Sequence, residues 1–146
     1  MKPFLIAVAL FASTFTKTMA ADSPAIEPSV LKSFSHTFAT ATEVDWSTTQ
    51  DLYKAVFLLN GQYVTAYFKP DGSMQAISRH ITTNTLPITL QTALKNNYKD
   101  QWLTDVLEVT NDSGVHYYVT LENADTKVIL KSSSTDWSTY QKQHKD

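Results

Sequence analysis

Cysteine is absent from the 146-residue chain, and glycine and proline are scarce, with three and five copies. Without cysteine, the chain can form no disulfide, no thiolate metal site and no lipid anchor of the bacterial lipoprotein kind. The low glycine and proline content, with no biased tract, argues against disorder inside the folded part. Core burial alone must therefore stabilise the domain.

The chain also lacks a large net charge of either sign. The formal net charge is −2 at pH 7, and the lysines and arginines are scattered along the chain. Domains that bind nucleic acid usually have a pI above about 9 and a clustered basic stripe. The composition therefore predicts no nucleic-acid partner.

The one long apolar run lies at the amino terminus. It covers residues 4 to 15, follows Lys2, and gives way to the small residues Ala20 and Ala21. This layout is typical of a secretory signal, and the run is shorter than the roughly 20 residues that span a bilayer. We predict that residues 1–21 are a signal peptide, leaving no stable membrane anchor after cleavage; an uncleaved N-terminal helix is the alternative. The expected location is periplasmic or secreted, and the lack of disulfides favours a bacterial periplasm.

Two short segments have apolar residues at helical spacing. Val30, Phe34 and Phe38 recur every four residues after Pro28, which predicts a helix over about 28 to 39. The segment that opens at Pro87 repeats the pattern with another three residues, Leu90, Leu94 and Tyr98. We therefore predict a second helix of the same kind.

Asn60-Gly61 separates two β-rich runs and is the strongest short hairpin signal, because both residues tolerate positive φ. A two-residue loop fixes the register and puts one set of apolar side chains on one face. The predicted pairs are Leu59 with Gln62, Phe57 with Val64, Ala55 with Ala66, and Tyr53 with Phe68. The strand of about 74 to 82 then extends the hairpin into a meander.

A second hairpin follows around Ala124-Asp125, with the expected pairs Leu121 with Val128 and Val119 with Leu130. Repetition of the helix and the hairpin predicts duplication. The expected fold class is α+β, a tandem repeat of a helix plus an antiparallel β-meander, with the helices packed on one face of joined sheets. We expect a single domain over 22–146, made of repeats at about 26–83 and 84–134, with a loose polar tail from about Ser138.

Several segments in this order resemble one known family. They are EPSVLKSFSHTF, VDW, YKAVF, NG, VTAYFKPDGS, LPITLQTAL and VHYYVTL, and together they cover about 28 to 132. The chain resembles the PepSY-like, β-lactamase-inhibitor-protein-like (BLIP-like) domains of exported bacterial proteins, which are frequent in the Bacteroidetes. The resemblance implies a tandem-repeat α+β fold, export, and a binding or inhibitory role. The end of the chain, SSSTDWSTYQKQHKD, departs from the aspartate-glycine turn and final strand usual in that family.

Residues for catalysis or metal binding form no recognisable pattern. No two of the four histidines, His36, His80, His116 and His144, have the spacing of a metal pair on one helix face. No nucleophile elbow is present. The sequence therefore predicts no enzyme, no metal and no cofactor.

The sheet face opposite the predicted core is rich in apolar and tyrosine side chains. Exposed apolar patches often mark binding sites, and tyrosine is favoured at interfaces, although tyrosines are also ordinary strand formers. The candidate binding residues are Lys54, Val56, Leu58, Tyr63, Tyr67, Tyr118 and Ile129. Of Trp46, Trp102 and Trp137, we expect only one to be exposed.

These observations predict a non-enzymatic exported binding module that contacts a protein, a peptide or a small ligand through this open sheet face. One alternative, by analogy with the family, is an inhibitor of a periplasmic protease or hydrolase. The other alternative is an unrecognised enzyme, which would require a polar pocket with perturbed carboxylates or histidines.

Overall fold

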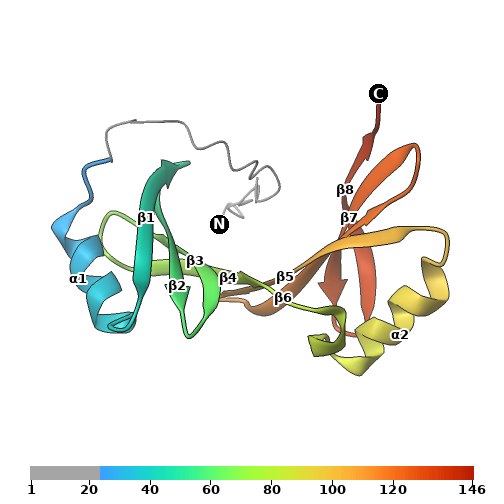
Figure 1. Ribbon diagram of the computed structural model, residues 1–146, viewed down its shortest axis with the longest axis horizontal. Coiled ribbons are helices and arrows are strands. Elements are labelled where there is room, and N and C mark those ends of the chain that lie inside the picture. Colours follow the sequence, from blue (N-terminus) through green and yellow to red (C-terminus); the bar gives the residue numbers. More distant parts are fainter. Residues whose placement is uncertain (1–23) are drawn as a thin grey trace.

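The computed structural model describes residues 24–146, so the predicted signal peptide at 1–21 lies outside the described residues. The helices are α1 (Pro28–Thr37) and α2 (Ile88–Asn97), with a short 3-10 helix, η1 (Thr83–Thr85), before α2. The strands are β1 (Thr42–Thr49), β2 (Leu52–Leu59), β3 (Gln62–Phe68), β4 (Met74–His80), β5 (Trp102–Asn111), β6 (Gly114–Glu122), β7 (Thr126–Ser133) and β8 (Asp136–His144) (Figure 1). None of the helices within 24–146 is long and apolar enough to cross a membrane.

Both helices form where the apolar spacing predicted them. Pro28 occupies the first turn of α1, where the missing N–H costs nothing, and Val30 and Phe34 are buried one turn apart. In α2 the corresponding buried residues are Leu90 and Leu94. Each helix is ten residues long. Isolated helices of this length are marginal in water, so packing against the sheet must stabilise both of them.

The predicted fold class, an α+β tandem repeat of a helix plus a meander, is wrong. The described chain is mostly one eight-stranded antiparallel sheet in the order β1 to β8, with only two short helices. β4 pairs with β5 from Ala76–Asn111 to His80–Leu107, so no boundary divides the sheet. The halves also pack differently, because β5 to β8 bury apolar clusters on both faces whereas β1 to β4 bury one on the helix side.

The register of both predicted hairpins is confirmed. Leu59 pairs with Gln62 and Phe57 with Val64, and the turn residues Asn60 and Gly61 have φ values of 51° and 80°. Two positive φ values in a two-residue loop are the mark of a type I′ turn, whose twist matches that of the strands. At the second tip the Asn123 side chain compensates for the weaker turn sequence, since its Oδ1 accepts hydrogen bonds from the backbone of Asp125 and Thr126.

Two large apolar cores lie on the face that carries the helices, which we call the helix face. Under α1, Phe34 packs edge-on against Phe57 with ring centroids 5.0 Å apart, and Ala55, Ala66 and Phe68 are fully buried beside them. Under α2, the core consists of Leu86, Leu90, Leu94, Val106, Val119, Leu121, Val128, Leu130 and Trp137. The two cores share no buried residue.

The loose polar tail expected from Ser138 is also wrong, because this segment forms strand β8. Its pairing with β7 runs from Ser133–Asp136 to Thr126–His144. Trp137 anchors the strand: its indole Nε1 donates a hydrogen bond to the Leu90 carbonyl of α2 at 3.0 Å. The polar composition misled the prediction, since an edge strand with one buried anchor is otherwise free to be hydrophilic.

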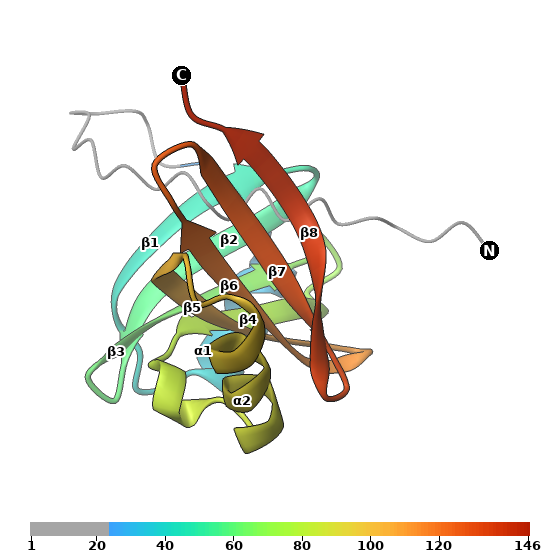
Figure 2. The same ribbon diagram turned by 90° about the vertical axis from the view of Figure 1, so that its right-hand side faces the viewer.

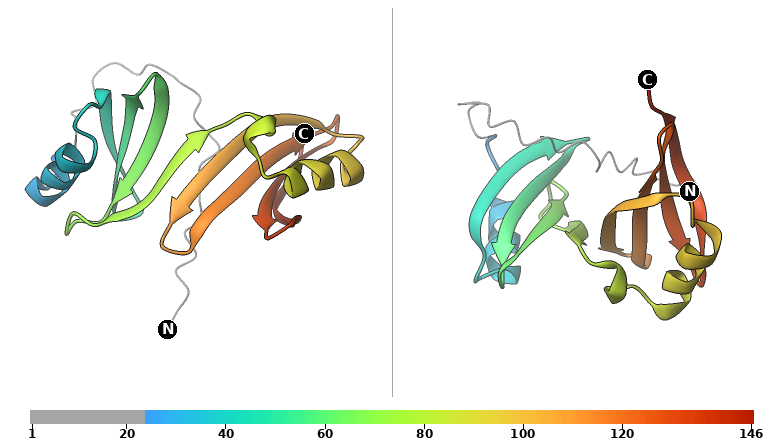
Figure 3. Two further views of the ribbon diagram at one scale, coloured as in Figure 1. Left: turned by 90° about the horizontal axis from the view of Figure 1, so that it is seen from below. Right: turned by 45° about the vertical axis from the view of Figure 1, so that its right-hand side comes forward.

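The sheet bends between its two ends, and the bend places the helices far apart. Figure 1 shows α1 and α2 at opposite ends of the molecule, with β4, β5 and β6 crossing between them. The end view shows the strands crossing one another at steep angles, as expected for a strongly twisted sheet (Figure 2). The face without helices therefore lines the inner side of the bend (Figure 3).

The turn after β3 contacts α1 through Gly72, and this contact can be tested. Gly72 has φ of 90°, and a Cβ there would lie 2.7 Å from the Ser29 carbonyl oxygen. Gly61 is the matched control, with φ of 80° and nothing within 4 Å of its Cβ position. Gly61→Ala should lower the free energy of unfolding by about 1–2 kcal/mol from backbone strain, and Gly72→Ala by about 2–3 kcal/mol because overpacking is added. Urea denaturation compares the two; equal losses would contradict the close contact.

Candidate functional site

The face opposite the helices, which we call the open face, runs across β2 to β7. Side chains alternate between faces along a strand, and directly paired residues share a face. The pairing therefore assigns to the open face Lys54, Val56, Leu58, Tyr63, Thr65, Tyr67, Ala76, Ser78, His80, Leu107, Val109, His116, Tyr118, Thr120, Lys127, Ile129 and Lys131. All seven candidate binding residues from the sequence lie on this face.

The five candidates of the first hairpin reach the surface to different extents. Lys54, Val56, Leu58 and Tyr67 are half-buried, whereas Tyr63 is 55% exposed. Burial raises the pKa of the Tyr67 phenol to about 12, so this hydroxyl stays protonated at neutral pH. The hairpin therefore presents a mixed apolar and neutral polar surface whose most prominent group is the Tyr63 ring.

Tyr118 and Ile129 are not part of an exposed surface, contrary to the sequence prediction. They are 5% and 4% exposed and form a third apolar cluster with Leu107 and Val109. The Tyr140 ring of β8 packs edge-on against Tyr118 at 5.3 Å, and Lys131 Nζ lies 5.8 Å from the centre of the Tyr118 ring. Alternation predicted the face correctly but could not show that its own side chains cover one another there.

Tyr63 is held by a hydrogen bond across the hairpin. Its hydroxyl donates to Glu43 Oε2 at 2.5 Å. Glu43 lies in the bulge of β1, where the register shifts between Thr42 and Asp45, and its φ is 52°. The hydrogen bond and the negative charge of Glu43 raise the pKa of Tyr63. Bulges commonly re-aim a side chain, and this one directs a carboxylate that fixes the exposed tyrosine.

Trp102 is a further candidate binding residue, which was not among the seven predicted from the sequence. As predicted, only one tryptophan is exposed: Trp102 at 68%, whereas Trp137 is buried and Trp46 is half-buried in the core under α1. Trp102 pairs with Glu122, which places its indole on the same side of the sheet as Thr120 and Ile129. Lys145 Nζ lies 2.9 Å from Glu122 Oε2 and lowers the pKa of that carboxyl.

One histidine on the open face is held by a carboxylate. His80 Nδ1 lies 2.7 Å from Asp105 Oδ1, so the pair links β4 and β5 on the inner side of the bend. A histidine–carboxylate pair needs an adjacent nucleophile or metal to do chemistry. No group of three or more histidine, aspartate or glutamate side chains within residues 24–146 could hold a metal ion. The His80–Asp105 pair is a side-chain contact between β4 and β5, at the seam between the two halves of the sheet.

Solved structures share this arrangement of strands and helices. A DUF2874 family protein from Bacteroides uniformis is similar at 19% identity with a TM-score of 0.73, over 82% of this chain and 90% of its own. A BLIP-like protein from Bacteroides fragilis is similar at 18% identity with a TM-score of 0.69, over 83% of this chain and 87% of its own. The fold is BLIP-like. The BLIP-like part of the resemblance seen in the sequence is thereby confirmed at the level of the fold, and the PepSY-like part is not.

A third similar structure comes from Bacteroides eggerthii and is provisionally described as a periplasmic protein. It is 17% identical with a TM-score of 0.73, over 83% of this chain and 90% of its own. No family model matches the chain, and no curated protein sequence matches it. At such low identity these similarities establish the fold and leave the function to be argued from the open face.

Proposed function

We propose that this protein is a non-enzymatic exported binding module that contacts a protein or peptide partner through its open face. The observation that carries the proposal is the exposure of two large aromatic side chains on that face, Tyr63 at 55% and Trp102 at 68%. Tyrosine and tryptophan are the residues most enriched among those that dominate binding energy at interfaces. When such a ring is buried against a partner, its apolar part gains contact area, and its hydroxyl or indole N–H can still form a hydrogen bond.

The geometry of the open face favours a macromolecular partner over a small ligand. The face lines the inner side of the bend and extends from β2 to β7, so it offers a broad curved surface (Figure 3). Tyr63 is already oriented by Glu43, and ordering a side chain before binding lowers the entropic cost of association. Half-buried Val56 and Leu58 beside Tyr63 supply an apolar surround.

The proposed compartment is the periplasm or the extracellular space. Two observations support it: the signal-like layout of residues 1–21, and the similarity to a Bacteroides eggerthii protein that is provisionally described as periplasmic. Within this compartment the second candidate function is inhibition of a protease or hydrolase. The similarity to a BLIP-like protein favours that candidate, by analogy of fold.

Affinity capture from the periplasmic fraction of the native bacterium tests the proposal. Wild type should retain a partner that the double variant Tyr63→Ala, Trp102→Ala loses, with an affinity decrease of about 100-fold or more once the partner is purified. Val115→Ala is the matched control, because Val115 is 51% exposed but pairs with Thr110 on the helix face. It should bind like wild type.

The outcomes separate the candidate functions. If the partner is a hydrolase whose activity falls when wild type binds, inhibition is supported. If the double variant, shown to be folded by circular dichroism, binds every partner as wild type does, the open face is not the binding surface and the proposal fails.

A further inference from the structure

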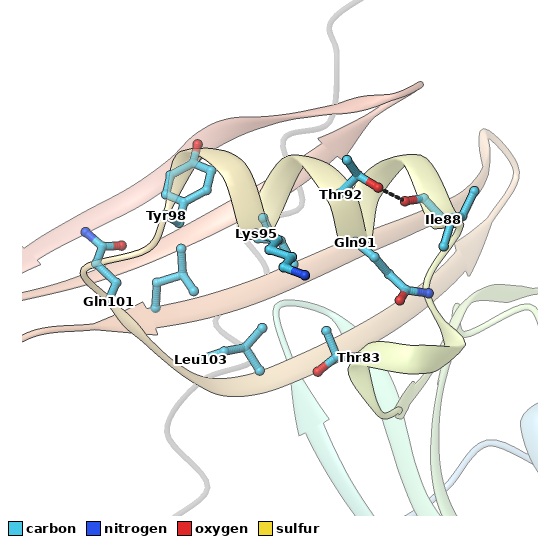
Figure 4. A pocket seen from close by; sticks show the side chains of 10 residues that line it. Thr83, Ile88, Gln91, Thr92, Lys95, Tyr98, Gln101 and Leu103 are labelled. Atoms are coloured by element: carbon cyan, nitrogen blue, oxygen red, sulfur yellow. Dashed lines mark hydrogen bonds between the residues drawn. The ribbon is translucent and has the colours of Figure 1, made fainter.

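A pocket of about 520 Å³ lies on the helix face, away from the open face. It is a cleft between α2 and the start of β5 that is open to solvent on one side, as Figure 4 shows. Leu94, Leu103 and Leu121 form its apolar wall, while Lys95, Tyr98 and Gln101 supply polar groups. Pockets that hold small ligands usually measure roughly 300–1,000 Å³ and combine an apolar lining with a few polar groups.

Lys95 is a solvent-exposed residue at the edge of the pocket, and its positive charge is not paired with a carboxylate of the described chain. Figure 4 shows its side chain beneath α2, in the space between the helix and β5. No salt bridge within residues 24–146 involves Lys95, although four others are formed there. A carboxylate near Lys95 Nζ would gain a charge-assisted hydrogen bond, about twice as strong as a neutral one.

Gln101 provides a hydrogen-bond acceptor at the other end of the pocket. Its Oε1 is buried and has no hydrogen-bond partner among the described residues. A buried oxygen without a donor is costly, so a donor brought by a ligand would be favourable.

We propose that this pocket binds the N-acylated form of an apolar α-amino acid with a free carboxylate, the chemistry that also ends a peptide chain. The carboxylate would bind Lys95, the amide N–H would donate to Gln101 Oε1, and the apolar side chain would lie against Leu94, Leu103 and Leu121. This site is separate from the open face, so it can succeed or fail independently of the proposed function.

Titration of the full exported chain with N-acetyl-L-leucine, followed by NMR of the leucine methyl groups, tests the proposal. We expect saturable shifts of Leu94, Leu103 and Leu121, with an affinity at least about 10-fold higher than for N-acetyl-L-leucinamide, which lacks the carboxylate. Lys95→Gln should remove that preference. Lys99→Gln is the matched control, since Lys99 is exposed beyond the end of α2 and outside the pocket lining, and it should retain the preference.

The tripeptide acetyl-Gly-Ala-Leu distinguishes the two sources of this chemistry. Tighter binding than N-acetyl-L-leucine assigns the site to a peptide carboxyl terminus, and weaker binding assigns it to a free N-acyl amino acid. Absence of methyl shifts at millimolar ligand would overturn the proposal, and so would equal affinities for the acid and its amide.

Discussion

Replacing Phe57 by alanine is expected to lower the free energy of unfolding by about 3–5 kcal/mol. The side chain is fully buried at the centre of the core under α1. Its ring centroid lies 5.0 Å from that of Phe34 and 4.7 Å from that of Phe38. Removing it leaves a cavity that rigid strands and a single helix can fill only in part, and it also takes away the ring contacts that hold α1 on the sheet.

Urea denaturation monitored by circular dichroism measures this loss. Leu31→Ala is the control, because Leu31 is exposed on the outer side of α1. That change should stay within about 0.5 kcal/mol of wild type. A loss below about 1 kcal/mol for Phe57→Ala would mean that α1 does not depend on this aromatic core. Domains of this size are stable by only about 5–15 kcal/mol, so the expected loss is a large fraction of the total.

Replacing Trp137 by alanine should have a comparable effect, about 3–5 kcal/mol. Trp137 is the buried residue of β8, and it joins this edge strand to α2 through the hydrogen bond from its Nε1 to the Leu90 carbonyl. Trp137→Phe removes the hydrogen-bond donor and keeps most, but not all, of the apolar volume. It should therefore cost about 0.5–1.5 kcal/mol for the hydrogen bond, with an added loss for the smaller ring.

Hydrogen exchange distinguishes local loss of β8 from global destabilisation. In Trp137→Ala the amides of β8 and of its partner β7 should exchange faster than those of β2 and β3, because the anchor of the edge strand is gone. Thr139→Ala, at an exposed position of the same strand, should change stability by less than about 1 kcal/mol. If exchange rose equally in every strand of Trp137→Ala, the tryptophan would be a general core residue and not an anchor of β8.

Local signals in the sequence predicted the first half of the sheet in detail. The Asn60-Gly61 turn fixed the pairing of β2 with β3, and the structure has each of the predicted pairs. The helix positions also followed, because each helix buries two apolar residues four positions apart. Such features depend on neighbours a few residues apart, and the sequence displays them directly.

Long-range packing was the part that the sequence did not reveal. Tyr118 and Ile129 alternate correctly onto the open face, yet they are buried by residues of other strands, such as Tyr140. The last strand was missed for the same reason: only Trp137 among its residues is buried, so its period-2 signal is weak. Repetition of apolar positions suggested two equivalent units, whereas the burial differs between the two halves of one sheet.

The sequence predicted the sheet face of the candidate binding site but not all of its exposed residues. The open face followed from alternation, and Tyr63, one of the seven candidate residues, is 55% exposed on it. The sequence predicted that one tryptophan would be exposed but did not identify Trp102 as that one. Its pairing with Glu122 and the bulge that follows in β5 could not be read from the chain. The pocket beneath α2 also lacks a sequence signal, since the residues around it come from η1, α2, β5 and β6.

The seam between β4 and β5 is a place where the two halves of the sheet can rotate relative to each other. The Arg79–Glu108 and His80–Asp105 pairs join the halves there, and the two helix-side cores share no buried residue. Adjacent strands tolerate a twist anywhere from about 10° to 35°. A small change of twist at this seam would rotate the two ends of the sheet relative to each other. The distance between the two ends of the open face would then change, while each helix stays packed on its own strands.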